Sequence, residues 1–143
     1  MSSDSPASGP PLRPILLIDD SHEDLFLTKR LLVRSGIKNP IVTVDGGEEA
    51  LVFLRAASLP GASDLLPCII FCDVRMPKVN GFEVLRSVRG QAPLARTPFV
   101  ILTGGDMPED REAAKRFGAD HFLVKFPQVD VLRRIIGDSC GSK

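Results

Sequence analysis

The sequence predicts an α/β protein built on a doubly wound, five-stranded parallel sheet. Five short apolar runs alternate with five amphipathic segments along the chain. Strictly alternating strands and helices are typical of a parallel sheet with helices on both of its faces. Several of the apolar runs also end in a polar or charged side chain, as in the run that ends at Asp73. The carboxyl ends of parallel strands are where open sheets hold their ligands, so these residues indicate a site there.

The predicted strands are short apolar runs bounded by Pro, Gly, Asp or Ser, the pattern of strands buried on both faces. They cover residues 14–19, 41–44, 68–72, 99–102 and 121–124.

The predicted helices show apolar side chains at helical spacing. The first begins after Ser21, a favourable N-cap, and runs toward Gly36, a residue typical of helix ends. The others cover residues 47–57, 82–88, 109–117 and 129–136, and the fourth is closed by Gly118. Residues 58–67 and 90–98 read as loops.

The chain has 143 residues, which suits one domain. We expect a disordered arm at residues 1–12, the domain at residues 13–138 and a tail at residues 139–143. The zero formal charge and the lack of Trp and Tyr argue against a nucleic-acid partner. No apolar stretch approaches the roughly 20 residues needed to span a membrane, and the first residues do not resemble a signal peptide. We therefore expect a cytoplasmic protein without a membrane partner.

The cysteines support the same location. Their number, three, is odd, which argues against a disulfide framework and for a reducing compartment. Cys68 and Cys72 lie on one predicted strand, roughly 13 Å apart, too far to bridge each other. Both are expected to be small buried residues, and Cys140 is expected to be an exposed bystander.

The candidate site gathers residues from the ends of four predicted strands: Asp19, Asp20, Asp73, Thr103 and Lys125. Three carboxylates within about 5 Å repel each other by roughly 3 kcal/mol per pair. Either one of them stays protonated or a cation lies among them. Mg²⁺ suits a few carboxylates and a backbone carbonyl, which Arg75 would supply.

With the cation in place, Asp73 is suited to attack a phosphoryl group and form an aspartyl phosphate. The Lys125 ammonium and the Thr103 hydroxyl would stabilise the transferred group, and Gly104 would leave room for it. Each of these features alone is a weak indication of function, because an acidic pair, a Thr-Gly or a Lys at a strand end more often has a structural role. Their order along one alternating pattern is far more specific.

These residues resemble the response-regulator receiver domain of two-component signalling. The resemblance rests on Asp19-Asp20, on Asp73 with Met76-Pro77-x-x-Asn80-Gly81, on Thr103-Gly104 and on Lys125, and it covers about residues 14–137. It implies a flavodoxin-like fold with strand order 2-1-3-4-5. The lack of an output domain and the loop at residues 58–67 look like the single-domain regulators that partner bacterial phytochromes.

The resemblance also implies roles. Asp73 would accept the phosphoryl group, Asp20 would bind Mg²⁺ directly, and Asp19 would bind it through water. Thr103 and Phe122 would form the switch. The donor would be a phosphohistidine on a sensor histidine kinase, and the likeness to phytochrome-associated regulators implies a kinase of the phytochrome type. A second copy of the chain would be a further partner. Such a protein receives phosphate and is not a turnover enzyme.

Two other functions compete with this one. An aspartyl phosphatase of the haloacid-dehalogenase type carries Asp-x-Asp, but here the second position is Arg75, which disfavours it. A degenerate receiver would bind partners without phosphorylation, but all five site residues are present. The two histidines are not catalytic candidates: His22 is expected to face water in a first helical turn, and His121 is expected to be structural.

The pattern leaves two local features open: the position of the Arg75 side chain and the form of the peptide bond after Lys125. The Arg75 side chain either reaches over the phosphoryl group and shields it from water, or lies in solvent. Receivers usually place Pro after the active-site lysine, with a cis peptide bond, but here Phe126 intervenes before Pro127. A cis bond to a residue other than Pro costs roughly 3–4 kcal/mol. We therefore expect a trans Lys125–Phe126 bond, with Phe126 on the exposed face.

Overall fold

The computed structural model describes residues 12–140. The predicted arm at residues 1–12, apart from Leu12, and the last three residues of the predicted tail lie outside the described residues. The elements along the chain are β1 (Ile15–Ile18), α1 (His22–Arg34), β2 (Ile41–Val44), α2 (Gly47–Ala57), the 3₁₀ helix η1 (Ser63–Leu65), β3 (Ile69–Cys72), α3 (Gly81–Arg89), β4 (Phe99–Thr103), α4 (Pro108–Phe117), β5 (His121–Val124) and α5 (Val129–Ser139).

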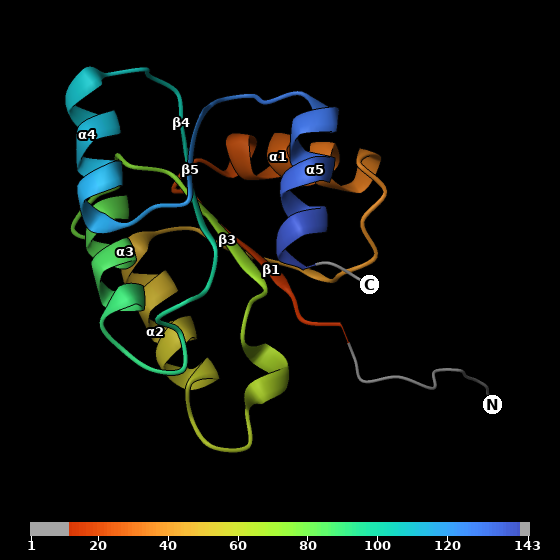
Figure 1. Ribbon diagram of the computed structural model, residues 1–143, viewed down its shortest axis with the longest axis vertical. Coiled ribbons are helices and arrows are strands. Elements are labelled where there is room, and N and C mark those ends of the chain that lie inside the picture. Colours follow the sequence, from red (N-terminus) through yellow and green to blue (C-terminus); the bar gives the residue numbers. More distant parts are fainter. Residues whose placement is uncertain (1–11, 141–143) are drawn as a thin grey trace.

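The strands form one parallel sheet in the order β2-β1-β3-β4-β5. The predicted fold and strand order are therefore confirmed. Helices α2, α3 and α4 cover one face of the sheet and α1 and α5 cover the other (Figure 1). The order reverses beside β1, so the ends of β1 and β3 meet at the point where open sheets bind ligands.

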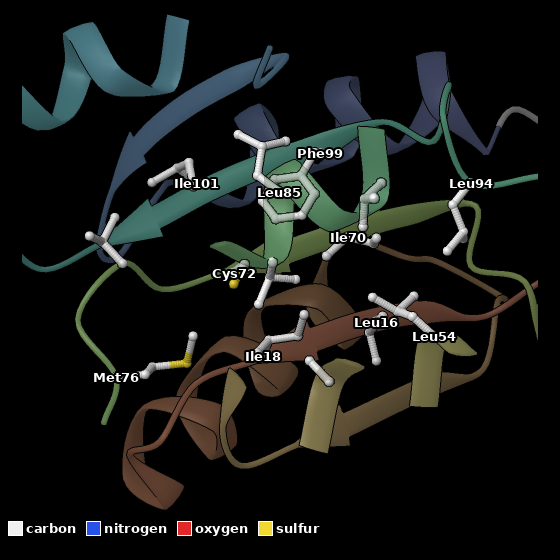
Figure 2. Packing of buried hydrophobic residues seen from close by; sticks show 14 of the residues in the cluster. Leu16, Ile18, Leu54, Ile70, Cys72, Met76, Leu85, Leu94, Phe99 and Ile101 are labelled. Atoms are coloured by element: carbon white, nitrogen blue, oxygen red, sulfur yellow. The ribbon is translucent and has the colours of Figure 1, made fainter. Parts of the chain in front are cut away.

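The core has two halves, one on each face of the sheet. Alternate residues of a strand point to opposite faces, so Leu16 and Ile18 pack toward α2 and α3, while Ile15 and Leu17 pack toward α1 and α5. Figure 2 shows the first half, in which Ile70, Phe99 and Leu85 also take part. β1, β3 and β4 are buried along their whole length, which explains why their sequences are continuously apolar.

Local signals placed most element ends well. The Ser21 hydroxyl accepts a hydrogen bond from the Asp24 backbone N–H at 3.2 Å and caps α1 as predicted. The predicted ranges of β2, α2 and β5 match the structure. The loop at residues 58–67 contains the short helix η1, which was not predicted, and α5 continues to Ser139, past its predicted end at residue 136.

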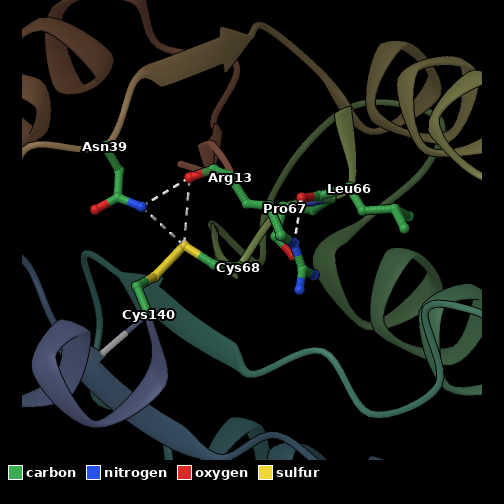
Figure 3. Close-up of a disulfide and its surroundings, with 6 residues drawn as sticks. All are labelled: Arg13, Asn39, Leu66, Pro67, Cys68 and Cys140. Atoms are coloured by element: carbon green, nitrogen blue, oxygen red, sulfur yellow. Dashed lines mark hydrogen bonds between the residues drawn. A yellow bond between two sulfur atoms is a disulfide. The ribbon is translucent and has the colours of Figure 1, made fainter. Parts of the chain in front are cut away.

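The prediction that the cysteines are unpaired is wrong for two of them. Cys68 and Cys140 form a disulfide across a Cα–Cα distance of 5.3 Å (Figure 3). Because α5 runs further than predicted, its end reaches the residue before β3. Cys72 is free and buried, as expected. The disulfide removes the argument for a reducing compartment, so the predicted location loses that support.

Hydrogen bonds near this disulfide also join the segments that precede β1, β2 and β3. The Asn39 side-chain amide donates to the Arg13 carbonyl at 2.8 Å, and the Arg13 guanidinium donates to the carbonyls of Leu66 and Pro67 (Figure 3). These bonds tie the amino ends of β1 and β3 to the loop before β2. Within residues 12–140, no helix is long and apolar enough to cross a membrane.

Candidate functional site

Three carboxylates meet at the carboxyl edge of the sheet, as predicted. Asp19 and Asp20 follow β1, and Asp73 follows β3; these strands pair so that Ile18 lies beside Cys72. One oxygen from each carboxylate lies within 4.8 Å of the others. Asp19 and Asp73 are buried, whereas Asp20 is exposed. The cluster therefore opens to solvent on the side of Asp20.

Asp73 is fixed by its backbone and by the start of α3. Its N–H donates to the Ile18 carbonyl at 3.0 Å, and its Oδ1 accepts from the Val74 N–H at 2.8 Å. Gly81 passes so close that an added Cβ would lie 2.1 Å from the Asp73 carbonyl oxygen. Asn80 caps α3 in a reciprocal pair with Glu83. The Asn80-Gly81 pair thus allows α3 to start directly against the carboxylate loop.

Lys125 lies at the end of β5 with its ammonium in the acidic cluster. Its side chain is 7% exposed. The Nζ atom donates to Asp19 Oδ2 at 2.6 Å and to Asp24 Oδ2 at 2.8 Å, and it lies 3.5 Å from Asp73 Oδ2. Burial alone would lower the pKa of Lys125, but the hydrogen bonds to Asp19 and Asp24 outweigh it and raise the pKa to about 12. The lysine is therefore a cation at neutral pH.

The surroundings of Asp73 shift the pKa of its carboxyl group. Burial raises the pKa of Asp73 above its usual value; Lys125 opposes this shift, and the nearby charge of Asp19 adds to it. A raised pKa means that the ionised form is held at a cost. A cation placed among the carboxylates would remove that cost and leave an ionised, nucleophilic Asp73.

Thr103 is the last residue of β4 and is buried beside the cluster. Its carbonyl accepts a hydrogen bond from the Lys125 N–H at 2.8 Å, which ties the ends of β4 and β5 together. A Cβ added to Gly104 would meet no atom within 4 Å. The edge next to Thr103 thus has open space, consistent with the room predicted there.

The Arg75 side chain is 65% exposed, which agrees with the expectation that it lies in solvent. Its Nη2 also donates to Asp110 Oδ2 on α4 at 2.7 Å, and the Asp110 side chain is 8% exposed. Whether the Arg75 backbone carbonyl binds a metal stays a prediction.

The predicted switch residue Phe122 lies on β5 and is half-buried. The Arg111 guanidinium lies over its ring, 4.6 Å from the centroid, and also pairs with Asp106. Phe122 and Arg111 line a surface cavity of about 460 Å³ between α4 and β5. Phe126 is 43% exposed, as expected.

The prediction of a trans Lys125–Phe126 bond is wrong, because the structure has this bond in the cis form. The prediction weighed the local preference of the peptide bond alone.

Two contact residues were missed. Asp24, in the first turn of α1, and Asp110, in the first turn of α4, were not among the predicted site residues. Neither carries a pattern of its own, because each is identified by a partner far away in sequence. His22 is exposed in the first turn of α1, as expected, and its Nε2 lies 3.2 Å from Asp45 Oδ2. His121 starts β5 and is exposed, and its structural role stays a prediction.

Comparison with known proteins agrees with this geometry. Rcp1, a response regulator of Synechocystis, is 31% identical over 121 residues, which are 85% of this chain and 81% of Rcp1. A solved Mn²⁺-bound form of Rcp1 superposes with a TM-score of 0.72 at 26% identity and covers 87% of this chain and 92% of that one.

Two further structures are similar. The bacteriophytochrome response regulator AtBRR has a TM-score of 0.76 at 31% identity, with 94% of this chain and 96% of AtBRR covered. The phosphorylated form of RcpA, a cyanobacterial phytochrome response regulator, has a TM-score of 0.74 at 25% identity, with 89% and 93% covered. The response regulator receiver domain model matches residues 15–137. The chain therefore belongs to the response regulator receiver domain family.

Proposed function

We propose that this protein is the phosphoacceptor of a two-component phosphorelay, and that it takes a phosphoryl group from a sensor histidine kinase onto Asp73. The observation that carries the proposal is the position of Asp73. This buried carboxylate has two other carboxylates within 4.8 Å and a buried ammonium at 3.5 Å. Such a site concentrates negative charge that a cation would neutralise, and the cation and the ammonium together would attract the anionic phosphoryl group.

The donor set fits Mg²⁺. Asp19, Asp20 and Asp73 offer carboxylate oxygens, the ligands this ion prefers, and the exposure of Asp20 leaves room for the waters that Mg²⁺ retains. We expect Asp73, Asp20 and the Arg75 carbonyl to bind it directly and Asp19 through water. When bound, the ion supplies positive charge next to the reacting oxygens. The Mn²⁺-bound form of Rcp1 supports a divalent cation in a related protein.

The chain's own residues then carry the transfer. One Asp73 oxygen forms a bond to phosphorus as the phosphorus–nitrogen bond of the donor phosphohistidine breaks, and the imidazole nitrogen keeps the electron pair and takes up a proton. The Lys125 ammonium stabilises charge on the phosphoryl oxygens, and the Thr103 hydroxyl donates a hydrogen bond to one of them. The phosphorylated form of RcpA supports this role by similarity.

Phosphorylation would be read out through Thr103 and Phe122. The Thr103 hydroxyl would move toward the phosphoryl group, and the Phe122 ring would turn into the space left beside β4. Because Phe122 lies under Arg111, its movement would disturb the first half of α4. Backbone amide shifts around Phe122, with and without a beryllium-fluoride phosphoryl mimic, test the switch. Unchanged shifts would contradict it.

The surface changed by the switch would be formed by α4, β5 and α5, and we propose a second copy of this chain as its partner. Sedimentation with and without the same mimic tests this separately. If the molecular mass from sedimentation is the same with and without the mimic, phosphorylation does not drive dimerisation. The proposed switch is not contradicted by that result.

The kinase partner is proposed by similarity. AtBRR and RcpA are phytochrome response regulators, so we propose a kinase of the phytochrome type. The predicted cytoplasmic location is kept as a proposal, without the support that unpaired cysteines would have given it. Transfer from candidate kinases of the source organism, compared at short times, would identify the cognate one. We expect one phosphoryl group per chain and slow loss, not repeated turnover. An aspartyl phosphatase would need an acid two residues after Asp73, where Arg75 pairs with Asp110.

The experiment that tests the proposal is incubation with phosphoramidate and Mg²⁺, followed by intact-mass analysis. We expect a mass gain of one phosphoryl group that is lost in Asp73→Ala and with excess chelator. Asp45→Ala, which removes an exposed acid outside the cluster, is the matched control and should keep the gain. A gain that survives Asp73→Ala would refute the assignment.

A further inference from the structure

Lys125 has a partner that the proposed chemistry does not use. The Asp24 carboxylate accepts a hydrogen bond from Nζ at 2.8 Å, which is closer than the 3.5 Å that separates Nζ from Asp73. The two residues are 101 positions apart in sequence. The phosphoacceptor's lysine is thus bound more tightly to a helix acid than to the phosphoacceptor itself.

Asp24 is well placed to hold this contact. It lies in the first turn of α1, where its backbone N–H is fixed by the Ser21 hydroxyl. Its side chain is 30% exposed. It is not among the three carboxylates that converge within 4.8 Å, so a metal ion there would leave its negative charge free for Lys125.

Lys125 does not need Asp24 to stay in the site. Its side chain is almost fully buried, and it also bonds Asp19 at 2.6 Å. An ammonium has three hydrogens to donate. Two of them serve Asp19 and Asp24, so one remains for a phosphoryl oxygen on Asp73, and the negative charge of the two carboxylates weakens the attraction of the ammonium for that oxygen. Asp24 also repels an anionic phosphodonor, an effect of the same sign.

We propose that Asp24 is a positioning residue that competes with the phosphoryl group for Lys125 and thereby slows phosphorylation of Asp73. The inference rests on the proposed function, and it adds a residue that sets the rate. The plain alternative is that Asp24 only supports the start of α1, since an acid near a helix N-terminus is favourable for stability. Glu23 separates the two, because it is an exposed acid in the same first turn.

The test compares Asp24→Asn with Glu23→Gln in the full chain. Each change removes one negative charge from the first turn of α1 without changing the side-chain size. The rate of phosphate uptake from phosphoramidate with saturating Mg²⁺ is followed by intact mass over a range of donor concentrations. We expect Asp24→Asn to raise the maximal rate by about fivefold, the scale of one charge-assisted hydrogen bond discounted for partial exposure. Glu23→Gln should leave it close to that of the unchanged protein.

Two additional measurements distinguish a direct contact between Asp24 and Lys125 from a long-range effect of the Asp24 charge. At high salt the effect of Asp24→Asn should persist, because contact pairs in a buried site are screened less than distant charges. In a structure of Asp24→Asn, Nζ of Lys125 should lie closer to Asp73 than the present 3.5 Å. If Asp24 served the helix alone, Asp24→Asn would neither change the rate at any salt concentration nor shorten the distance between Nζ and Asp73.

The outcomes are separable from the proposed function. If the unchanged protein takes up no phosphate, the proposed function fails. If it takes up phosphate but Asp24→Asn is slower than the unchanged protein, or no faster than Glu23→Gln, the inference on Asp24 is overturned and the phosphoacceptor role stands.

Discussion

The two ends of strand β3 are held in opposite ways. Cys68, just before the strand, is joined covalently to Cys140 at the end of α5. Asp73, just after the strand, lies among paired charges, with the side chains of Asp19 and Lys125 both buried beside it. The amino edge is therefore closed by a covalent bond and by hydrogen bonds from side chains to backbone carbonyls, and the carboxyl edge by ion pairs. One strand is thus fixed covalently at one end and carries the proposed phosphoacceptor site at the other.

The largest expected effect is at the amino edge. Cys140→Ser removes a disulfide between residues 72 positions apart, and a crosslink over a loop of this length stabilises a fold by about 4 kcal/mol in the chain-entropy model. Denaturant unfolding under oxidising conditions measures the loss. Uptake of phosphate by Asp73 should stay unchanged, because the disulfide lies at the far end of the strand.

The control is the same comparison with excess reductant. The unchanged protein should then unfold at the same denaturant concentration as Cys140→Ser. A variant that remains less stable in reductant would show that Cys140 acts through packing and not through the disulfide.

Lys125→Met should have the next largest effect. It leaves Asp19 and Asp24 without their cation, and removing one partner of a buried ion pair costs about 3 kcal/mol. Unfolding is measured with chelator present, so that no metal replaces the lysine. Lys29→Met, at an exposed position of α1, is the matched control. Equal stability of the two variants would show that the ion pairs contribute nothing.

The contribution of Lys125 also predicts a pH dependence. Its pKa is raised to about 12 in the folded protein, above the usual value of about 10.4. The folded state therefore binds the proton more tightly than the unfolded chain. The stabilisation should be complete below about pH 10 and lost as the pH rises through about 12.

A smaller effect is expected where the carboxyl edge meets α4. Asp110→Asn should lower stability by about 1 kcal/mol, because the buried carboxylate loses its charge-assisted bond from Arg75. Asp106→Asn, whose pair with Arg111 lies in solvent, should have no measurable effect. Thermal unfolding of both variants compares them. An equal loss in the two would show that burial of Asp110 does not matter.

The smallest effect on stability is expected for Phe126→Ala. The ring is largely exposed, so unfolding and small-molecule phosphorylation should stay unchanged, while binding to a kinase or to a second copy should weaken. Val52→Ala, also exposed and on α2, is a matched control for a change of apolar surface. If Phe126→Ala instead abolished phosphorylation, the role of Phe126 would be to position Lys125.

Local patterns predicted much of the fold. Buried strands such as β1 and β3 are continuously apolar, so their positions and their carboxyl ends could be located. The residues at those ends, Asp19, Asp73 and Lys125, could then be placed together by the rule for parallel sheets. The strand order itself came from the family resemblance, because alternation alone does not determine it.

What could not be predicted depends on pairs distant in sequence. Cys140 was read as unpaired because the end of α5 carries no signal that it reaches β3. Asp24 and Asp110 look like ordinary first-turn acids until their partners are known. For the cysteines and for these two acids, the deciding contact joins segments that only the fold brings together. The Lys125–Phe126 bond was judged on its local preference alone, and the prediction was wrong.

The most direct test of the central claim is to identify the phosphorylated residue chemically. After incubation with phosphoramidate and Mg²⁺, borohydride reduces an aspartyl phosphate to homoserine, which peptide mass spectrometry locates. We predict homoserine at position 73 and none at positions 19, 20 or 24. Homoserine at one of those positions, or a phosphoryl group that resists borohydride and maps to a histidine or a hydroxyl residue, would contradict the account.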